Sequence, residues 1–451
     1  MIHRRQRMAR IGVLLGALAF VSSACLGSDT GGTAEGGSEG GGGGGESGGE
    51  VLAAFEGDEA TRFQAVVDAF NEQSESGEIE FISATAFETE VNTRFQSGNP
   101  PDIAIWPNPG GLLDQSDNLK PLSEIEGLDL EAYEADLVPG FLTAAERDGE
   151  FYGLPYRMAV KSIVWTPEPA FADGGYAVPE TYDELIELTN TIREDGTTPW
   201  CLGVESGDAT GWPFTDWIEE YVLRTAGAEV YDQWVAHEIP FNDPQILEAA
   251  QRFEEDIFTE ENIVGGRQGA VSTPFGDAFN VAFDDEPGCY MMRQGNFITS
   301  EGFFPDDIRE DLEGNVETFY FPSGIEGGVE ENPVLLGGDL AGRADTDSTA
   351  ADAFMAFLAT PEAAEPWASE GGFLTPLTTF DPAGYPDELT RDVAAIGVEA
   401  DVARYDASDQ MPGAVANAFW AQTVAWASGS QDLEAALATV EETFAAEAGS
   451  E

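Results

Sequence analysis

The sequence predicts an α/β fold built from two lobes, and three observations support this prediction. After residue 50 the chain alternates between strand-like and helix-like segments, which argues for a mainly parallel sheet with right-handed crossovers. Residues 51–451 are long enough to form two lobes. Within this region, no segment of the sequence is apolar for long enough to span a bilayer.

The alternation is clearest at the start of this region, where three strands enclose two helices. Short apolar runs predict the strands, and apolar residues on one face predict the helices. The first helix carries Phe63, Val66, Val67 and Phe70 on that face, and the second closes on Gly98. The predicted strands are 50–55, 78–84 and 102–106, and the predicted helices are 58–74 and 87–98.

Further helices follow, each with its own start signal. Thr181 and Glu184 form a capping box for a helix over 182–194. Pro244 opens another helix, and a third begins at Ser348 or Thr349. The last helix runs from Asp432 toward Ala446. We interpret the apolar stripes of these helices as core, namely Leu185, Leu188, Ile192, Ile246, Ala250, Phe253, Ile257, Leu433, Leu437, Val440 and Phe444.

The N-terminus predicts export and anchoring. Residues 1–24 combine a basic head, an apolar run and small residues, as a signal peptide does. Cys25 follows, which matches the bacterial lipoprotein pattern of cleavage and lipidation; the alternative is ordinary secretion with an incidental cysteine. Residues 25–50 are rich in Gly, Ser and Glu and predict a flexible tether. We therefore expect an extracytoplasmic protein, anchored by lipid to the outer face of the cell membrane.

The charge of the chain excludes two classes of partner. The sequence has 85 acidic residues against 19 basic ones, which gives a net charge of −66. Nucleic acids and anionic membrane surfaces would be repelled, so we expect neither as a partner. This balance is typical of adaptation to salty surroundings, where screening relieves self-repulsion. It indicates a habitat and not a function.

Cys201 and Cys289 remain once Cys25 is assigned to the lipid anchor. In an oxidising compartment, two such cysteines are expected to pair as a disulfide. The alternative is a pair of buried free thiols.

Several kinds of reaction centre lack their parts. His237 is the only histidine beyond the signal peptide, which removes histidine-based triads and most zinc sites. Lys120 and Lys161 are the only lysines and neither follows a glycine, so there is no phosphate-binding P-loop. Residues 345–352 lack the glycine and terminal glutamate of a calcium loop, and we interpret them as a helix cap. We expect no metal, cofactor or catalytic residue, although paired carboxylates leave a glycosidase mechanism open.

The segment GNPPDIAIWPNPGG (98–111) places Trp106 at the exit of a predicted strand. Ligands of open α/β sheets bind beyond the carboxyl ends of the strands, and the FEGDE loop (55–59) leaves its strand at the same rim. We therefore predict that the Trp106 ring faces a ligand. The alternative is that this ring packs under a loop.

Aromatic residues also recur beside turn residues and carboxylates later in the chain. Their flat faces can stack on the CH faces of sugar rings, while Asp, Glu and Asn bind the hydroxyls. No cluster has the density of Lys and Arg that an anionic ligand needs. This inventory indicates an uncharged, polyhydroxylated ligand. The clusters are TGWPFTDWIEE (210–220), STPFGDAF (272–279), RQGNF (293–297), LLGGDLAG (335–342) and NAFW (417–420).

The order of these motifs makes residues 51–446 resemble the bacterial extracellular solute-binding proteins of carbohydrate ABC importers. WCLGVESGDATGWPFTDWIEE (200–220) is most similar to the α-glucoside-binding branch, which handles trehalose, maltose, sucrose or glucosylglycerol. The other motifs that carry the resemblance are FEGDE (55–59), PPDIAIW (100–106), YGLPYRMAVKSIVWTP (152–167), GCYMMRQGNF (288–297), GGDLAG (337–342), FLATPEAAEPWASEGGFLTP (357–376) and MPGAVANAFWAQTVAWASG (411–429).

The similarity to maltose-binding proteins implies a sugar site. Phe297 stands where the maltose binder has a stacking tryptophan, and Glu59 stands where a lysine is often found, so the hydrogen bonds there must differ. Asp277 and Asp339 are added on their chemistry, and Tyr156 has a ligand role or a hinge role. The predicted ligand-binding residues are Glu56, Asp58, Trp106, Tyr156, Trp212, Asp277, Phe297, Asp339 and Trp420. We interpret Trp217, Trp367 and Trp426 as packing residues.

The resemblance implies the periplasmic-binding-protein fold, in which a ligand cleft lies between two α/β lobes. Three hinge crossovers would join the lobes near residues 155–163, 333–343 and 375–380. The predicted domains are the signal peptide 1–24, the tether 25–50, lobe 1 with 51–157 plus 338–376, and lobe 2 with 158–337 plus 377–447.

The implied function is that of a lipid-anchored monomer without enzyme activity. It would bind an α-glucoside or a small oligosaccharide, close around it and deliver it to the membrane subunits of an ABC permease. Two other interpretations stay open. One is an extracellular glycoside hydrolase that uses two of the many carboxylates. The other is a binding protein for a polyol or a polyamine, since an acidic, aromatic cleft would suit a cation.

Overall fold

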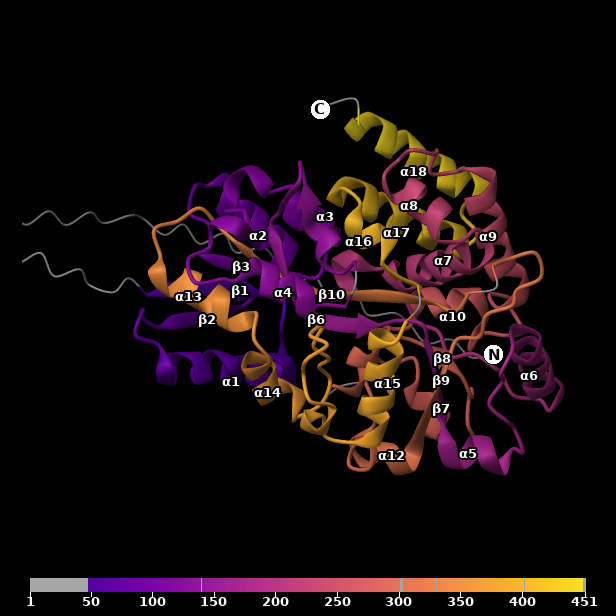
Figure 1. The fold of residues 1–451 in the computed structure, drawn as a ribbon. Coiled ribbons are helices and arrows are strands. Elements are labelled where there is room, and N and C mark those ends of the chain that lie inside the picture. Colours follow the sequence, from indigo (N-terminus) through magenta and orange to yellow (C-terminus); the bar gives the residue numbers. More distant parts are fainter. Residues whose placement is uncertain (1–47, 139, 301–302, 330, 401, 449–451) are drawn as a thin grey trace, which may run out of the picture. The chain divides into compact units, whose positions relative to one another are not determined.

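A mixed sheet of six strands is the framework of the first part of the fold (Figure 1). The computed structural model describes residues 48–138, 140–300, 303–329, 331–400 and 402–448. Strand β1 lies between β2 and β3 and is parallel to both, while β10 is antiparallel to β3 and β6 and parallel to β11. The strands are β1 (Gly49–Ala53), β2 (Ile79–Ser83), β3 (Ile103–Trp106), β6 (Gly153–Val160), β10 (Pro333–Arg343) and β11 (Val402–Tyr405).

Helices from distant parts of the sequence cover this sheet. Figure 1 shows α13 and α14 beside α1 and the strands β1 and β2, although they come much later in the chain. The predicted stripe of α1 is buried in this first core, and Ser348 caps α13 as expected. The helices of this region are α1 (Gly57–Gln73), α2 (Phe87–Gln96), α3 (Pro109–Leu113), α13 (Thr349–Leu358), α14 (Pro361–Ala368) and α15 (Glu388–Val398), of which α14 packs on α1 and α13 and the others contact the strands. Two shorter elements of this region are α4 (Leu130–Asp136) and the hairpin of β4 (Glu146–Arg147) and β5 (Glu150–Phe151).

A second, three-stranded sheet has the order β8–β7–β9, and both of its pairs are antiparallel. The expected parallel arrangement therefore holds for β1, β2 and β3 but not for this sheet. Its strands are β7 (Ile163–Pro167), β8 (Met292–Arg293) and β9 (Val316–Tyr320). Around it lie α5 (Glu168–Asp173), α11 (Asp306–Arg309) and α12 (Leu312–Asn315).

A second core is built mainly from helices. The capping box of Thr181 and Glu184 is present at the start of α6, and the predicted stripes of α6 and α9 are buried. The helices of this core and its border are α6 (Tyr182–Glu194), α7 (Trp212–Thr225), α8 (Ala228–Val235), α9 (Pro244–Asp256), α10 (Gly266–Ser272), α16 (Ala407–Gln410), α17 (Gly413–Ala427) and α18 (Leu433–Ala448).

The chain enters or leaves the six-stranded sheet at three segments that hydrogen-bond to one another. We call them the joint, which consists of residues 161–162, 335–336 and 405–407. The Lys161 backbone N–H donates to the Leu335 carbonyl at 2.8 Å, and the Asp406 N–H donates to the Leu336 carbonyl at 2.7 Å. The Ser162 hydroxyl accepts from the Leu335 N–H at 2.7 Å. Two segments of the joint, 161–162 and 335–336, fall within predicted crossovers, but 405–407 falls in none of them. The remaining predicted crossover, 375–380, follows Leu374, which pairs with Met158 of β6.

Gly338 allows β10 and β6 to approach each other beside the joint. Its φ is +152°, and a Cβ atom there would lie 2.0 Å from the Arg157 carbonyl oxygen. Because a backbone carbonyl cannot move aside cheaply, only glycine fits at this position.

Cys201 and Cys289 form a disulfide, as predicted, with a Cα–Cα distance of 5.5 Å. It links the segment before α7 to the segment before β8. Both cysteines are buried.

None of the helices in the described part of the chain has the length and apolar character needed to cross a bilayer. The predicted signal peptide, Cys25 and the predicted tether up to residue 47 lie outside the described residues.

Removing the disulfide should lower the stability of the fold. The two cysteines are 88 residues apart, so the crosslink restricts a long loop of the unfolded chain. We expect the C201A/C289A variant to lose about 2–4 kcal/mol of unfolding free energy in urea titrations. A reductant should lower the stability of the wild type and leave the variant unchanged; equal sensitivity of both proteins would contradict the assignment.

Candidate functional site

A cavity of about 850 Å³ lies where the joint meets α2, α7, α16 and α17. These elements come from five separate regions of the sequence. Helix α2 contributes Phe87 and Glu88, the joint contributes Lys161 and Asp406, and α17 contributes Trp420. The cavity is therefore formed only when both cores are in place.

Aromatic rings form one wall of this cavity. The centroid of the Trp212 ring lies 5.9 Å from that of Phe297, and Trp420 lines the cavity from α17. The indole N–H of Trp420 is buried and has no hydrogen-bond partner among the described residues. A buried donor without a partner is costly, so this N–H is available to a ligand.

Gly211 brings two of these rings together. Its φ is +115°, and a Cβ atom there would lie 2.4 Å from the Trp420 carbonyl oxygen. The N-terminus of α7, which begins at Trp212, can therefore contact the α17 backbone only because residue 211 is glycine.

Arg157 and Asp339 form a charged pair on another side of the cavity. The Arg157 Nε lies 2.5 Å from Asp339 Oδ2, and its Nη1 lies 2.6 Å from Glu59 Oε1. The guanidinium also stacks over Phe55 and Trp367 at about 5 Å. Burial raises the pKa of Asp339, and the Arg157 charge opposes that shift. The Arg157 guanidinium is thus paired with two carboxylates of the protein.

A second group of charges forms the floor of the cavity. We call it the Lys161 cluster; it consists of Lys161, Asp216, Glu219, Asp406 and Asp409. The Lys161 Nζ lies 2.5 Å from Asp406 Oδ2, 3.0 Å from Asp216 Oδ1 and 3.8 Å from Asp409 Oδ2. The side chains of Lys161, Asp216 and Asp406 are 8 %, 3 % and 1 % exposed. All members except Glu219 line the cavity.

The cluster also supports the aromatic wall. The Lys161 ammonium lies 5.4 Å from the centroid of the Trp212 ring, which is a cation–π distance. Asp216 follows Trp212 by one helical turn on α7. The position of the Trp212 ring therefore depends on the ion pairs beneath it.

The carboxyl groups of the cluster are driven to different protonation states. Burial raises the pKa of Asp216 to about 8, with Lys161 opposing the shift and Asp406 adding to it. Burial and the Asp406 charge also raise the pKa of Glu219 and of Asp409. Burial would raise the pKa of Asp406 as well, but Lys161 and the hydrogen bonds it accepts lower it below its usual value. One ammonium therefore balances one firmly ionised carboxylate.

The carboxylates of Asp216, Glu219 and Asp406 lie close enough to hold a cation, with ligand atoms within 4.8 Å of one another. The Lys161 ammonium already contacts two of the three. The positive charge in this group is thus supplied by the protein itself.

Four of the predicted ligand-binding residues line the cavity: Trp212, Phe297, Asp339 and Trp420. Trp106 lies elsewhere, which corrects the expectation that its ring faces outward. Its side chain is only 1 % exposed and packs against Phe87 and Phe95, with both ring centroids 6.0 Å away. The reason is that β10 pairs with β3 as far as Trp106, so the strand exit is reached one residue later, and Pro107 and Asn108 line the cavity.

The other predicted site residues also lie away from the cavity lining. Tyr156 is buried against Phe373, with ring centroids 5.2 Å apart. Asp58 contacts Arg309 at 3.3 Å and Arg62 at 3.6 Å on another side of the first lobe. Glu56 is the N-cap residue of α1 without a side-chain cap hydrogen bond, and Asp277 is in a turn before Asn280. Their ligand contacts are not supported by these positions.

The Lys161 cluster was not predicted from the sequence, although the spacing of acidic residues on α7 is one signal for it. Asp216, Glu219 and Glu220 fall at positions i, i+3 and i+4 of an otherwise apolar helix, so they share one face. All three are buried. Buried acids need a cation or a proton, and Lys161 is one of only two lysines in the chain.

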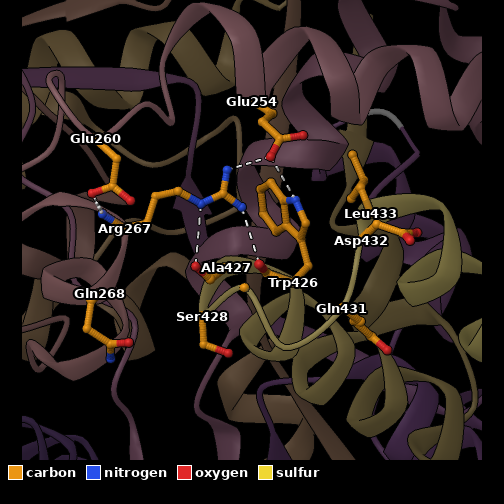
Figure 2. A pocket seen from close by; sticks show the side chains of 11 residues that line it. Glu254, Glu260, Arg267, Gln268, Trp426, Ala427, Ser428, Gln431, Asp432 and Leu433 are labelled. Carbon is orange, nitrogen blue, oxygen red and sulfur yellow. Dashed lines mark hydrogen bonds and ion pairs between the residues drawn. The ribbon is translucent and has the colours of Figure 1, made fainter.

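A smaller cavity of about 290 Å³ lies where α9 and α10 meet the end of α17 (Figure 2). Figure 2 shows the Arg267 guanidinium bonded to Glu254 and to the carbonyls of Trp426 and Ala427. It also lies 4.7 Å from the ring centroids of Phe258 and Trp426. Arg267 clamps these helices, and Trp426 is a packing residue, as are the buried Trp217 and Trp367.

Residues 56–365 match the family described as bacterial extracellular solute-binding protein. The chain belongs to this family. This solute-binding protein is 39 % identical over 402 residues to the osmoprotective compounds-binding protein of Synechocystis sp., covering 87 % of the chain and 91 % of that protein. It is 37 % identical over 395 residues to an α-glucosides-binding periplasmic protein of Rhizobium meliloti, covering 86 % and 84 %.

The fold of this solute-binding protein also matches solved structures. The cyclic α-maltosyl-1,6-maltose binding protein from Arthrobacter globiformis superimposes with a TM-score of 0.65 at 21 % identity, covering 89 % of this chain and 99 % of that one. The predicted two-lobe binding-protein fold is thereby confirmed.

The raised pKa of Asp216 predicts a pH dependence of stability. Folded Asp216 keeps its proton up to about pH 8, whereas an unfolded aspartate loses it near pH 4. Its contribution to stability is therefore complete below about pH 4 and is lost as the pH rises through about 8. The Tm of the wild type should fall relative to that of D216N between about pH 5 and about pH 9 in thermal unfolding at constant salt. Parallel curves for the two proteins would contradict this assignment.

Proposed function

We propose that this solute-binding protein binds an uncharged α-glucoside or a related small oligosaccharide in the 850 Å³ cavity. One observation carries the proposal: the cavity combines the rings of Trp212, Phe297 and Trp420 with polar groups, and both cations of its lining are already paired with carboxylates of the protein. Flat rings suit the CH faces of a sugar, and the polar groups suit its hydroxyls. The volume is also within the range of small-molecule sites.

The pairing of charges supports an uncharged ligand. Arg157 and Lys161 are the cations of the lining, and each contacts at least two carboxylates of the protein. Neither is therefore free to bind a phosphate or a carboxylate of a ligand. Several carboxyls of the lining hold their protons more tightly than usual, because burial raises the pKa of Glu88, Asp216, Asp339 and Asp409. This weakens the attraction for a polyamine.

The printed names of two relatives support the class of ligand. One relative binds osmoprotective compounds and the other binds α-glucosides. Both are similar over most of this chain. Trehalose, maltose, sucrose and glucosylglycerol are the ligands that we would test first.

We further propose that the protein delivers its ligand to the membrane subunits of an ABC permease. Lipid attachment at Cys25 would keep it at the outer face of the membrane while the tether leaves the folded part free to move. Closure of the lobes around the sugar would satisfy the buried Trp420 N–H and hide the ligand from water.

A glycoside hydrolase is the competing function. It would need two carboxyl groups that are free to reach the glycosidic bond. In this cavity Asp339 is bonded to Arg157, and Asp216 and Asp406 are bonded to Lys161. The charges of these groups are thus used to hold the cavity together, which favours binding over hydrolysis.

A thermal-shift panel tests the class of ligand. We expect a rise in Tm with at least one of maltose, trehalose, sucrose and glucosylglycerol, because a ligand that binds only the folded state stabilises it. Spermidine, glycerol and a phosphorylated sugar serve as comparisons. A shift with spermidine alone would overturn the proposal, and steady release of glucose from maltose or trehalose would favour the hydrolase.

Truncation of the aromatic wall should weaken sugar binding. We expect W420A to raise the Kd for the sugar selected in the panel by roughly tenfold or more, which is about 1.4 kcal/mol or more in binding free energy, measured by calorimetry. W426F is the matched control, because Trp426 lies on the same helix but packs against Phe214 and Phe258 instead of the cavity. An unchanged Kd in W420A, or an equal loss in W426F, would contradict the proposed site.

A further inference from the structure

The Lys161 cluster contains more carboxyl groups than the mechanism of sugar binding needs. Four acids surround one ammonium, and full ionisation would leave three buried negative charges without a partner in the cluster. Uncompensated buried charge is strongly unfavourable, so such a group must bind either a cation or a proton.

Cations on neighbouring elements supply only part of the missing positive charge. Arg293 of β8 and Arg224 both pair with Glu220, and the Arg293 charge opposes the rise in the pKa of Asp216. Arg157 pairs with Glu59 and Asp339. The other charged or titratable groups close to the cluster are an acid and two phenols, namely Glu88 of α2, Tyr231 of α8 and Tyr405 of β11.

The hydrogen bonds of the cluster show where a proton is needed. Asp406 accepts from Lys161, from the Ser408 hydroxyl at 2.9 Å and from the Asp409 N–H at 3.0 Å. Glu219 accepts from the N–H groups of Ala407 and Ser408 at 2.8 and 3.1 Å. Asp216 accepts from Lys161 through Oδ1, but its buried Oδ2 has no donor among the described residues.

We propose that Asp216 holds a proton on Oδ2 in the folded protein and donates it to Asp406, so that Asp216 is a positioning residue for the ligand cavity. Carboxylate oxygens of Asp216 and Asp406 lie within 4.8 Å of each other, and a hydrogen bond between the two side chains contributes to the raised pKa of Asp216. The bond ties α7 to the joint and to the start of α16. It also leaves Oδ2 satisfied and reduces the negative charge of the cluster.

The protonation of Asp216 connects to binding through Trp212, four residues earlier on α7. Loss of the proton places two like charges side by side at the point where α7 meets the joint. Their repulsion displaces the first turn of α7 and with it the indole that stacks over Lys161. Affinity for the ligand therefore falls when Asp216 ionises, an expectation that rests on the proposed sugar-binding function.

The direction of the titration follows from the environment of Asp216. Burial, opposed by Lys161 and assisted by Asp406, raises its pKa to about 8. The proton is therefore bound near neutral pH and is released in alkaline solution. Asp406 stays ionised throughout this range, because its pKa is lowered.

Two measurements on the full chain test the proposal. Infrared spectroscopy at about pH 6 should show a stronger band of protonated carboxyl groups in the wild type than in D216N, since Glu219 and Asp409 also have raised pKa values, and this difference should vanish above about pH 9. Titration with maltose, trehalose, sucrose and glucosylglycerol should show a Kd for the bound sugar that rises about tenfold or more between about pH 6 and about pH 9.5.

D216N keeps a donor toward Asp406 but cannot titrate, so its Kd should change less than about twofold over the same range. D173N is the matched control, because Asp173 is an exposed residue of α5 outside the cavity and its substitution should leave the wild-type pH profile in place.

The outcomes separate this inference from the proposed function. If the band is as strong in D216N as in the wild type at about pH 6, or if D216N follows the wild-type pH profile, the inference is overturned. If no sugar binds at any pH, the proposed function fails, and the infrared band still decides whether Asp216 holds a proton. If D216N does not fold, the wild type alone tests the inference. The pH midpoint of the decrease in the infrared band must then equal the pH midpoint of the loss of sugar affinity.

Discussion

The contact between the Lys161 ammonium and the carboxylates of Asp406 and Asp216 is the interaction on which the rest of the structure depends. Lys161 and Asp406 lie in two segments of the joint, and Asp216 lies on a helix of the second core. A single buried cation thus connects both cores at the point where the chain passes between them. Because it is buried, water and salt screen it far less than they screen the surface charges.

This contact shapes the chemistry of the cavity as well as its position. Lys161 is one of the two cations in the lining, and this contact pairs it with carboxylates. The other cation, Arg157, is paired with Asp339 and Glu59. The groups that remain for a ligand are aromatic faces, carboxyl groups that are protonated or already paired with a cation, and the Trp420 N–H, which has no partner among the described residues. In a chain with a net charge of −66, burial and pairing reduce the negative charge that the six acidic and two basic residues of the lining would otherwise give this cavity.

Local sequence patterns predicted the elements well, because they depend on neighbours in the chain. The stripe of α1 and the capping box of α6 need only residues within a few turns. Trp106 could not be placed in this way. Its strand was predicted, but that strand pairs with β10, whose residues lie more than two hundred positions away, and the Trp106 ring is buried as a result. The acids of α7 were predicted only as part of an aromatic cluster with carboxylates, because the ion pair of Asp216 is made with Lys161, 55 positions away in the sequence.

The sequence alone determined the two-lobe α/β fold, the disulfide, the family and the aromatic character of the site, because these follow from periodicity, composition and the order of motifs. Only the tertiary structure decided which aromatic rings reach the cavity and which acids share protons. The physical reason is that burial and pKa depend on groups that meet in space, and seven separate stretches of the chain meet at this cavity.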